Sequence, residues 1–158
     1  RTPLHNACSK GHEEIVQLLL DKGAKIDTTD YDNNTPLHSA AFVGSKEIVQ
    51  MLIDAGAVID ASNKDKETPL NNAVSKKHKE IVQLLLDKGA KTNTIRGNVN
   101  DTPLHTAAED GSREIVQMLI DAGAAIEASN KDKQTPLHNA VSEKHKEIVQ
   151  LLLDKGAK

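Results

Sequence analysis

Seven histidines are the residues of this chain with the widest chemical repertoire, because imidazole binds metal ions and transfers protons near neutral pH. Four end the tetrapeptide Thr-Pro-Leu-His and three stand just before a Glu-Ile-Val run; the two sets are His5, His38, His105 and His138, and His12, His78 and His145. A zinc site needs three or four ligands converging at about 2.1 Å. If equivalent histidines stand on layers packed about 8–10 Å apart, they are too distant to share one ion. The sequence therefore predicts no metal site.

Cys8 is the only cysteine, so it cannot form an internal disulfide, and a free thiol fits a reducing compartment. Its counterparts in related segments are Ala41, Val74, Ala108 and Val141, which favours a small core residue over a nucleophile. Its nearness to His5 and His12 reflects helical spacing rather than a catalytic pair. No glycine-rich phosphate loop is present. Because no catalytic set interrupts the repetition, we predict no enzyme activity and no cofactor.

The charge balance argues against nucleic acid and membrane partners. The net charge is −3 and the pI about 6.2, so no broad positive field is available for phosphates. Lys76, Lys77 and Lys79 form a local basic spot, but Asp65 and Glu67 lie close to it in the repeat. No apolar run approaches the ~18 residues of a membrane span. The chain begins inside a motif, at Arg1, so we expect a fragment or an engineered chain, cytoplasmic if natural.

The elements that position these residues repeat along the chain. Thr-Pro pairs stand at residues 2–3, 35–36, 68–69, 102–103 and 135–136, at spacings of 33, 33, 34 and 33 residues. Thr as N-cap with Pro at the first helical position predicts a helix start. In the second unit we expect a helix over 36–43 and another over 46–55, followed by a left-handed C-cap at Gly56. The polar stretch 58–67 is rich in turn-forming residues.

The unit TPLHxAxxxGxxEIVQLLLDKGA resembles the ankyrin repeat over essentially the whole chain. The resemblance implies an all-α solenoid of helix-turn-helix units with projecting β-hairpin fingers, and a single domain over 1–158. The predicted repeats are 1–28, 29–61, 62–94, 95–128 and 129–158. A single unit cannot bury its own apolar stripe, so the units must stack. The resemblance also implies that the TPLH histidines bond the backbone and the Thr hydroxyl, a role that Asn71 can take over in the third unit.

Two unit types alternate, since residues 35–66 and 102–133 differ at only 6 of 32 positions. Duplication of pairs and deliberate design both explain this alternation. Neither end carries the polar substitutions typical of solenoid caps. We therefore expect exposed apolar surface around Ile148 and Leu152, and weak end-to-end self-association.

Departures from the repeat predict where a partner binds. In this family, partners usually dock on the fingertips and first helices, which together form a concave face. The first helices carry Phe42-Val43 where the fourth unit has Glu109-Asp110, and Tyr31 stands where other fingertips have Lys. The finger 91–105 is one residue longer than its siblings and brings apolar residues to its tip. The predicted partner-binding residues are Tyr31, Asp32, Asn34, Phe42, Val43, Lys64, Glu67, Lys76, Ile95, Arg96 and Val99.

The favoured function is non-catalytic binding of another protein, either natural or as an engineered binder. One alternative is a passive scaffold or spacer within a larger protein. Another is a regulatory module for an enzyme on a different chain. At the residue level, Phe42 could instead fold back over neighbouring helices, and the long finger could be a repacked loop without a partner.

Overall fold

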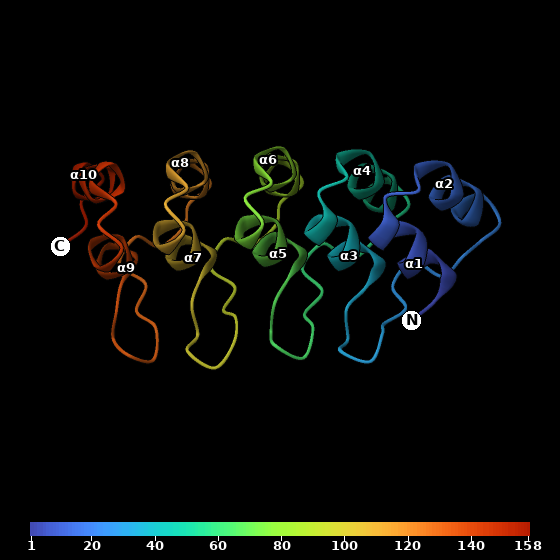
Figure 1. The fold of residues 1–158 in the computed structure, drawn as a ribbon, viewed down its shortest axis with the longest axis horizontal. Coiled ribbons are helices and arrows are strands. Elements are labelled where there is room, and N and C mark those ends of the chain that lie inside the picture. Colours follow the sequence, from blue (N-terminus) through green and yellow to red (C-terminus); the bar gives the residue numbers. More distant parts are fainter.

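Ten short helices form two parallel rows in a computed structural model that describes all residues from 1 to 158 (Figure 1). The inner row, from which the loops project, contains α1, α3, α5, α7 and α9, and the outer row contains α2, α4, α6, α8 and α10. The bounds are α1 Pro3–Lys10, α2 Glu13–Asp21, α3 Pro36–Val43, α4 Lys46–Asp54, α5 Pro69–Ser75, α6 Lys79–Asp87, α7 Pro103–Glu109, α8 Arg113–Asp121, α9 Pro136–Ser142 and α10 Lys146–Asp154. None of these helices has the length and apolar character required to cross a bilayer. The predicted all-α solenoid of five helix pairs is confirmed.

Each inner helix begins at the Thr-Pro pair, as the sequence predicts. The Thr residue is the N-cap in all five helices, and its side chain and that of the residue three positions later form a reciprocal capping box. In the second repeat, Gly44 ends α3 in the left-handed region with φ of 96°. Gly56 follows α4 with the same φ. The start and stop signals of the sequence therefore set the helix bounds.

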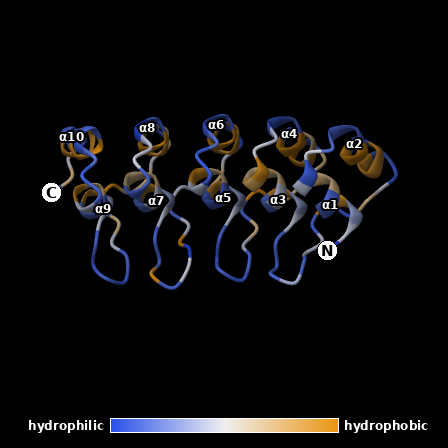
Figure 2. Ribbon diagram, viewed as in Figure 1, coloured by the Kyte–Doolittle hydropathy of each residue, from blue (hydrophilic) through white to orange (hydrophobic).

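One continuous apolar core runs between the two rows of helices. It holds 30 buried hydrophobic residues, drawn from every repeat, and consists almost entirely of Leu, Ile, Val and Ala. Figure 2 shows hydrophobic colour on the helices and mostly hydrophilic colour on the loops. Because each repeat contributes one thin layer, medium-sized aliphatic side chains fill the space without aromatic rings.

The loops between helix pairs project as fingers, named here the first (residues 22–35), second (55–68), third (88–102) and fourth (122–135) finger. They are hydrogen-bonded turns, and the only bridge of β type joins Arg96 and Asp101. Neighbouring fingertips are linked by the backbone. The N–H groups of Lys64, Gly97 and Lys131 donate to the carbonyls of Asp32, Asp65 and Val99 at 2.9, 2.7 and 2.9 Å.

The prediction that Ile148 and Leu152 form exposed apolar surface in the last repeat is wrong, because both residues are buried. The position of Ile148 faces the preceding repeat: its counterpart Ile15, which has no preceding repeat, is 48% exposed. Conversely, Val141 is 56% exposed because its position faces a following repeat. Apolar surface is therefore present at both end repeats, but on different side chains from those expected. Whether it causes self-association stays a prediction.

Candidate functional site

The TPLH histidines hold adjacent repeats together. His38 accepts a hydrogen bond at Nδ1 from the Thr35 N–H at 3.1 Å, and its Nε2 lies 3.0 Å from the Glu67 carbonyl oxygen. The ring therefore carries its proton on Nε2 and donates to the next finger. His5 and His105 make the same contact with the carbonyls of Asn34 and Gln134 at 2.9 and 3.0 Å. Burial lowers the pKa of His38 below its usual value. These contacts confirm the predicted structural role.

Two of the remaining histidines form a second kind of link that the sequence analysis missed. His78 donates from Nε2 to the Phe42 carbonyl at 3.1 Å, and His145 donates to the Glu109 carbonyl at 2.9 Å. Each ring covers a glycine of the preceding repeat, Gly44 or Gly111. The alternation of the two repeat types contained a signal for this link. Apart from the first repeat, whose successor has Ser45, each repeat with glycine at this position is followed by a repeat with histidine just before its second helix. Nowhere do three or more possible metal ligands gather.

Cys8 has the surroundings of a core residue. Its side chain is fully buried, and this burial raises the pKa of the thiol to about 12. The thiol therefore stays protonated at physiological pH, whereas a nucleophilic cysteine needs its thiolate. The predicted core role of Cys8 is confirmed.

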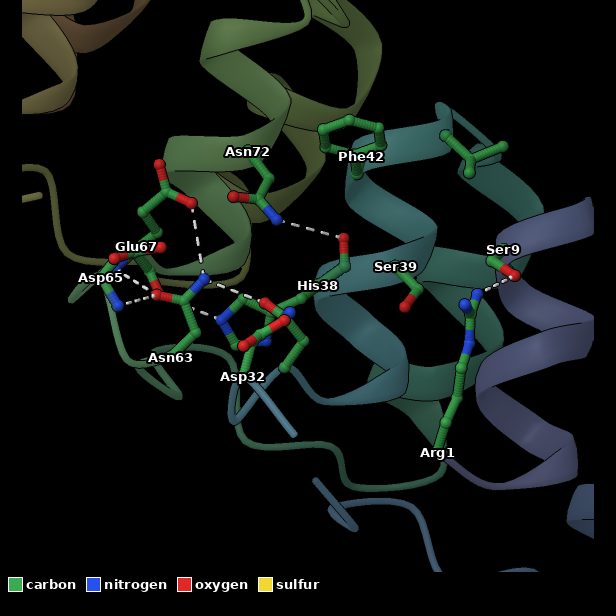
Figure 3. A pocket seen from close by; sticks show the side chains of 12 residues that line it. Arg1, Ser9, Asp32, His38, Ser39, Phe42, Asn63, Asp65, Glu67 and Asn72 are labelled. Atoms are coloured by element: carbon green, nitrogen blue, oxygen red, sulfur yellow. Dashed lines mark hydrogen bonds between the residues drawn. The ribbon is translucent and has the colours of Figure 1, made fainter. Parts of the chain in front are cut away.

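A groove of about 390 Å³ lies between the inner helices and the first two fingers (Figure 3). Its lining residues are Arg1, Ser9, Asp32, Asn34, His38, Ser39, Phe42, Val43, Asn63, Asp65, Glu67 and Asn72. Figure 3 shows the acidic side chains on the finger wall, Phe42 at the opposite end and Arg1 at the side. The groove thus combines one apolar end with a carboxylate-rich wall.

Five of the predicted partner-binding residues line this groove: Asp32, Asn34, Phe42, Val43 and Glu67. Phe42 is 50% exposed and Val43 is 42% exposed, so neither folds back into the core. Lys76, a sixth predicted residue, places its Nζ 4.2 Å from the centroid of the Phe42 ring. This cation–π contact places the Lys76 ammonium over the Phe42 ring at the groove edge, and the ring stays half exposed.

The other predicted residues lie on the fingers, outside the groove. Tyr31 is 88% exposed at the first fingertip and is not among the residues that line the groove. Lys64 lies 4.0 Å from Asp32, at the distance limit of an ion pair. Arg96 contacts Glu67 at 3.4 Å and so connects the third finger to the groove wall. Ile95 and Val99 are partly exposed on the third finger, whose tip is hydrophobic in Figure 2 where its neighbours are hydrophilic.

Polar residues of the groove were missed by the sequence analysis. Asn63 shapes the second finger, because its Oδ1 accepts from the Asp65 and Glu67 N–H groups, both at 2.9 Å. Its Nδ2 donates to Asn34 Oδ1 at 2.9 Å and joins the first two fingers. Asn72 lines the groove on α5 at a position where the other repeats have Asn6, Ser39, Thr106 and Asn139. Because three of the five repeats have Asn at this position, the comparison of repeats that singled out Phe42 gives no signal for Asn72.

Comparison with known proteins agrees with this architecture. A family model described as Ankyrin repeats (3 copies) matches in four overlapping stretches, residues 1–63, 32–96, 58–130 and 91–158. No curated protein matches the chain. Because the family matches extend over the whole chain and the ten helices fit about five repeats, the protein belongs to the ankyrin repeat family.

Proposed function

We propose that this chain is a non-catalytic protein-binding module whose partner docks in the groove and anchors on Phe42 and Val43. Ankyrin repeats are generally protein–protein interaction modules and are typically non-catalytic. The observation that carries the proposal is the half-exposed Phe42 at the edge of a 390 Å³ groove, beside Val43. Two adjacent apolar side chains at a groove edge present water-exposed surface that a partner can cover.

Comparison with sibling repeats supports a binding role over a packing role. At the place of Phe42, the fourth repeat has the exposed carboxylate Glu109, so this position does not need an apolar side chain for folding. Because Phe42 is already half buried, covering the rest of its side chain with a partner contributes about 0.8–1.5 kcal/mol. Aromatic residues are also enriched among the residues that dominate binding energies. A hydrated side chain at the position of Phe42 is therefore compatible with folding, and we expect a partner to displace the water that surrounds Phe42.

The predicted finger residues extend this surface on both sides. Tyr31 presents a free ring at the first fingertip, with a hydroxyl that can donate to a partner. On the other side, Arg96 reaches Glu67 at the groove wall, while Ile95 and Val99 add apolar surface on the same finger. The proposed surface therefore runs from Tyr31 across the groove to the third finger, with Asn34, Lys64 and Lys76 as its polar surroundings.

Replacement of Phe42 and Val43 by the residues at the same place in the fourth repeat tests this proposal. The variant F42E/V43D copies Glu109-Asp110, and the matched control S142E/E143D makes the same sequence at the equivalent place in the last repeat. We expect both variants to melt near the wild-type temperature. Proteins captured by the wild type and the control should be lost from F42E/V43D, with at least about a tenfold rise in Kd for a purified partner.

Equal affinity of F42E/V43D and wild type for every captured protein would reject Phe42 and Val43 as the anchor and favour a passive scaffold. Unfolding of F42E/V43D alone would show instead that the pair stabilises the fold.

A further inference from the structure

The junction between α5 and α7 lacks the histidine link that joins the other inner helices. Asn71 stands at the histidine position, and it caps α5 by accepting from the Thr68 N–H at 2.9 Å. Its shorter side chain makes no bond to a carbonyl of the third finger. The Asn71 Nδ2 group has no hydrogen-bond partner although the residue is only 1% exposed. An unsatisfied buried donor of this kind opposes the packed state.

The third finger has also lost an apolar contact at this junction. Ile26, Ile59 and Ile126 pack against the core from the equivalent place in the other fingers. The third finger has Thr92 there, and this residue is 8% exposed. Replacement of a branched aliphatic side chain by a hydroxyl in a buried position removes part of the hydrophobic driving force for stacking.

The same finger has no internal side-chain clamp. Asp30, Asn63 and Asn130 each accept two backbone N–H groups of their own finger, at 2.9–3.0 Å. Arg96 occupies this position in the third finger and has no acceptor oxygen in its side chain. It contacts Glu67 instead, as a partly exposed ion pair that dissolved salt weakens. The finger also has one extra residue, taken up near Gly97, whose φ is 62°.

Unpaired polar atoms gather at this junction. Of the four buried side-chain atoms without a partner, three flank it: Asn71 Nδ2, Asn100 Oδ1 and Thr106 Oγ1. The apolar core and the hydrogen bond from the Gly97 N–H to the Asp65 carbonyl still cross the junction, whereas the other polar contacts there are partly buried or exposed. They include Thr94 Oγ1 to Asn71 Oδ1 at 3.2 Å, Lys77 Nζ to the Asp110 carbonyl at 2.9 Å, and the Lys79–Glu114 ion pair. Surface contacts of this type contribute little to stability.

We propose that the array opens at the α5–α7 junction, so that α7–α10 detach and unfold as a block while α1–α6 and the groove stay folded. In a linear array, stability is a sum of repeat and interface terms, so one weak interface divides the cooperative unit. The detached block has only two repeats and one internal interface, so it unfolds more readily than the three-repeat block. This opening concerns the scaffold and does not depend on the proposed binding function.

Hydrogen exchange with mass spectrometry on the full chain tests the proposal. We expect amides of α7–α10 to exchange through an opening that leaves α3–α6 protected. The variant N71H/T92I restores both sibling residues and should slow that exchange roughly ten- to a hundredfold. Thr94 need not change, because Thr28 coexists with His5 at the equivalent places and bonds the Lys25 carbonyl instead.

The mirror variant H38N/I59T serves as the matched control, since it introduces the same two residues between α3 and α5. It should create a second opening at the α3–α5 junction, so that α5 and α6 lose the protection from exchange that they have in the wild type. The proposal would be overturned if α3–α6 and α7–α10 of the wild type exchanged in one common step. It would also be overturned if the amide exchange rates of α7–α10 were the same in N71H/T92I as in the wild type. Exchange that remains confined to α7–α10 in H38N/I59T would overturn it as well.

Discussion

His38 shows how a titratable residue becomes part of the backbone network. Its Nδ1 must stay unprotonated to accept from the Thr35 N–H, while Nε2–H donates to the Glu67 carbonyl. Protonation of Nδ1 would place its N–H group against the Thr35 N–H, so that two donors would face each other in a buried site. The lowered pKa of His38, which burial causes, is consistent with this arrangement.

Acid should therefore destabilise the protein through His38. Its folded-state pKa lies below the unfolded value, so the unfolded chain binds the proton first as the pH falls. Stability is present above about pH 6.5 and declines below it, by at most about 1.4 kcal/mol per pH unit for one group. Urea unfolding between pH 7 and pH 5 should show this decline. The slope should be shallower for H38N, which places the Asn of the third repeat at this position, and equal slopes would contradict the assignment.

At the level of single residues, the sequence predicted exposure well where repeats differ. Phe42 and Val43 stand where siblings have polar side chains, and both are exposed. It failed for Ile148, because apolar character does not tell which side of a layer a residue faces. It also gave no indication of the Lys76–Phe42 contact, which depends on the stacking of two layers. The assignment of these residues to partner binding stays a proposal.

The end of an inner helix in one repeat interlocks with the start of the outer helix in the next repeat through glycine and histidine. A Cβ atom added to Gly44 would lie 2.6 Å from Cε1 of His78, and one added to Gly111 would lie 2.7 Å from Cε1 of His145. Gly11 has a similar positive φ but open space around its Cα. Thus Gly44 is required both by its backbone conformation and by the ring above it, whereas Gly11 is favoured by conformation alone.

The pair G44A and G11A should separate these two requirements. Alanine at a left-handed position costs about 1–2 kcal/mol in either variant. G44A should lose about 1–3 kcal/mol more, because the new methyl group overlaps the His78 ring. Chemical denaturation measures the difference. The double variant G44A/H78S, with the serine of the second repeat, should recover most of the excess, and no recovery would show that the ring is not the obstacle.

At the level of elements, helix positions could be predicted because caps and apolar spacing are local signals. The expected helices over 36–43 and 46–55 agree with α3 and α4 to within one residue. The fingers were harder, because their shape depends on side chains such as Asn63 that bond their own backbone. The sequence showed that the third finger has one extra residue. That Thr92 and Asn71 leave this finger without the contacts that Ile and His make in the other repeats becomes apparent only when the layers are stacked. The exact repeat boundaries stay a prediction, since the helix pairs do not depend on them.

The whole molecule is a row of layers in which inner positions have two neighbours and end positions have one. Leu52 is fully buried within the array, whereas its counterpart Leu19 in the first repeat is only partly buried. The same side chain thus contributes differently according to its place in the row. The difference is confined to the first repeat, because the counterparts Leu85, Leu119 and Leu152 are also fully buried and each has a preceding repeat to pack against.

Leucine truncations should report this difference between the first repeat and the others. L52A should destabilise the array by about 2–5 kcal/mol, because it leaves a cavity between filled layers. L19A should cost clearly less, because water can enter beside a partly exposed side chain. Urea unfolding monitored by circular dichroism gives both values. A larger effect for L19A than for L52A would contradict the layered account of the core.

The interlock of Gly44 with His78 and of Gly111 with His145 also limits how the gene for such a protein can change length. Loss of the fourth repeat alone would bring His145 onto the third repeat, which has Lys77 at the glycine position, and the Lys Cβ would then overlap the imidazole. Loss of the second repeat alone would instead place His78 over Gly11. Loss or gain of two repeats at once keeps every glycine beneath its histidine. We therefore expect deletion of the fourth repeat alone to destabilise the array more than deletion of the second repeat alone.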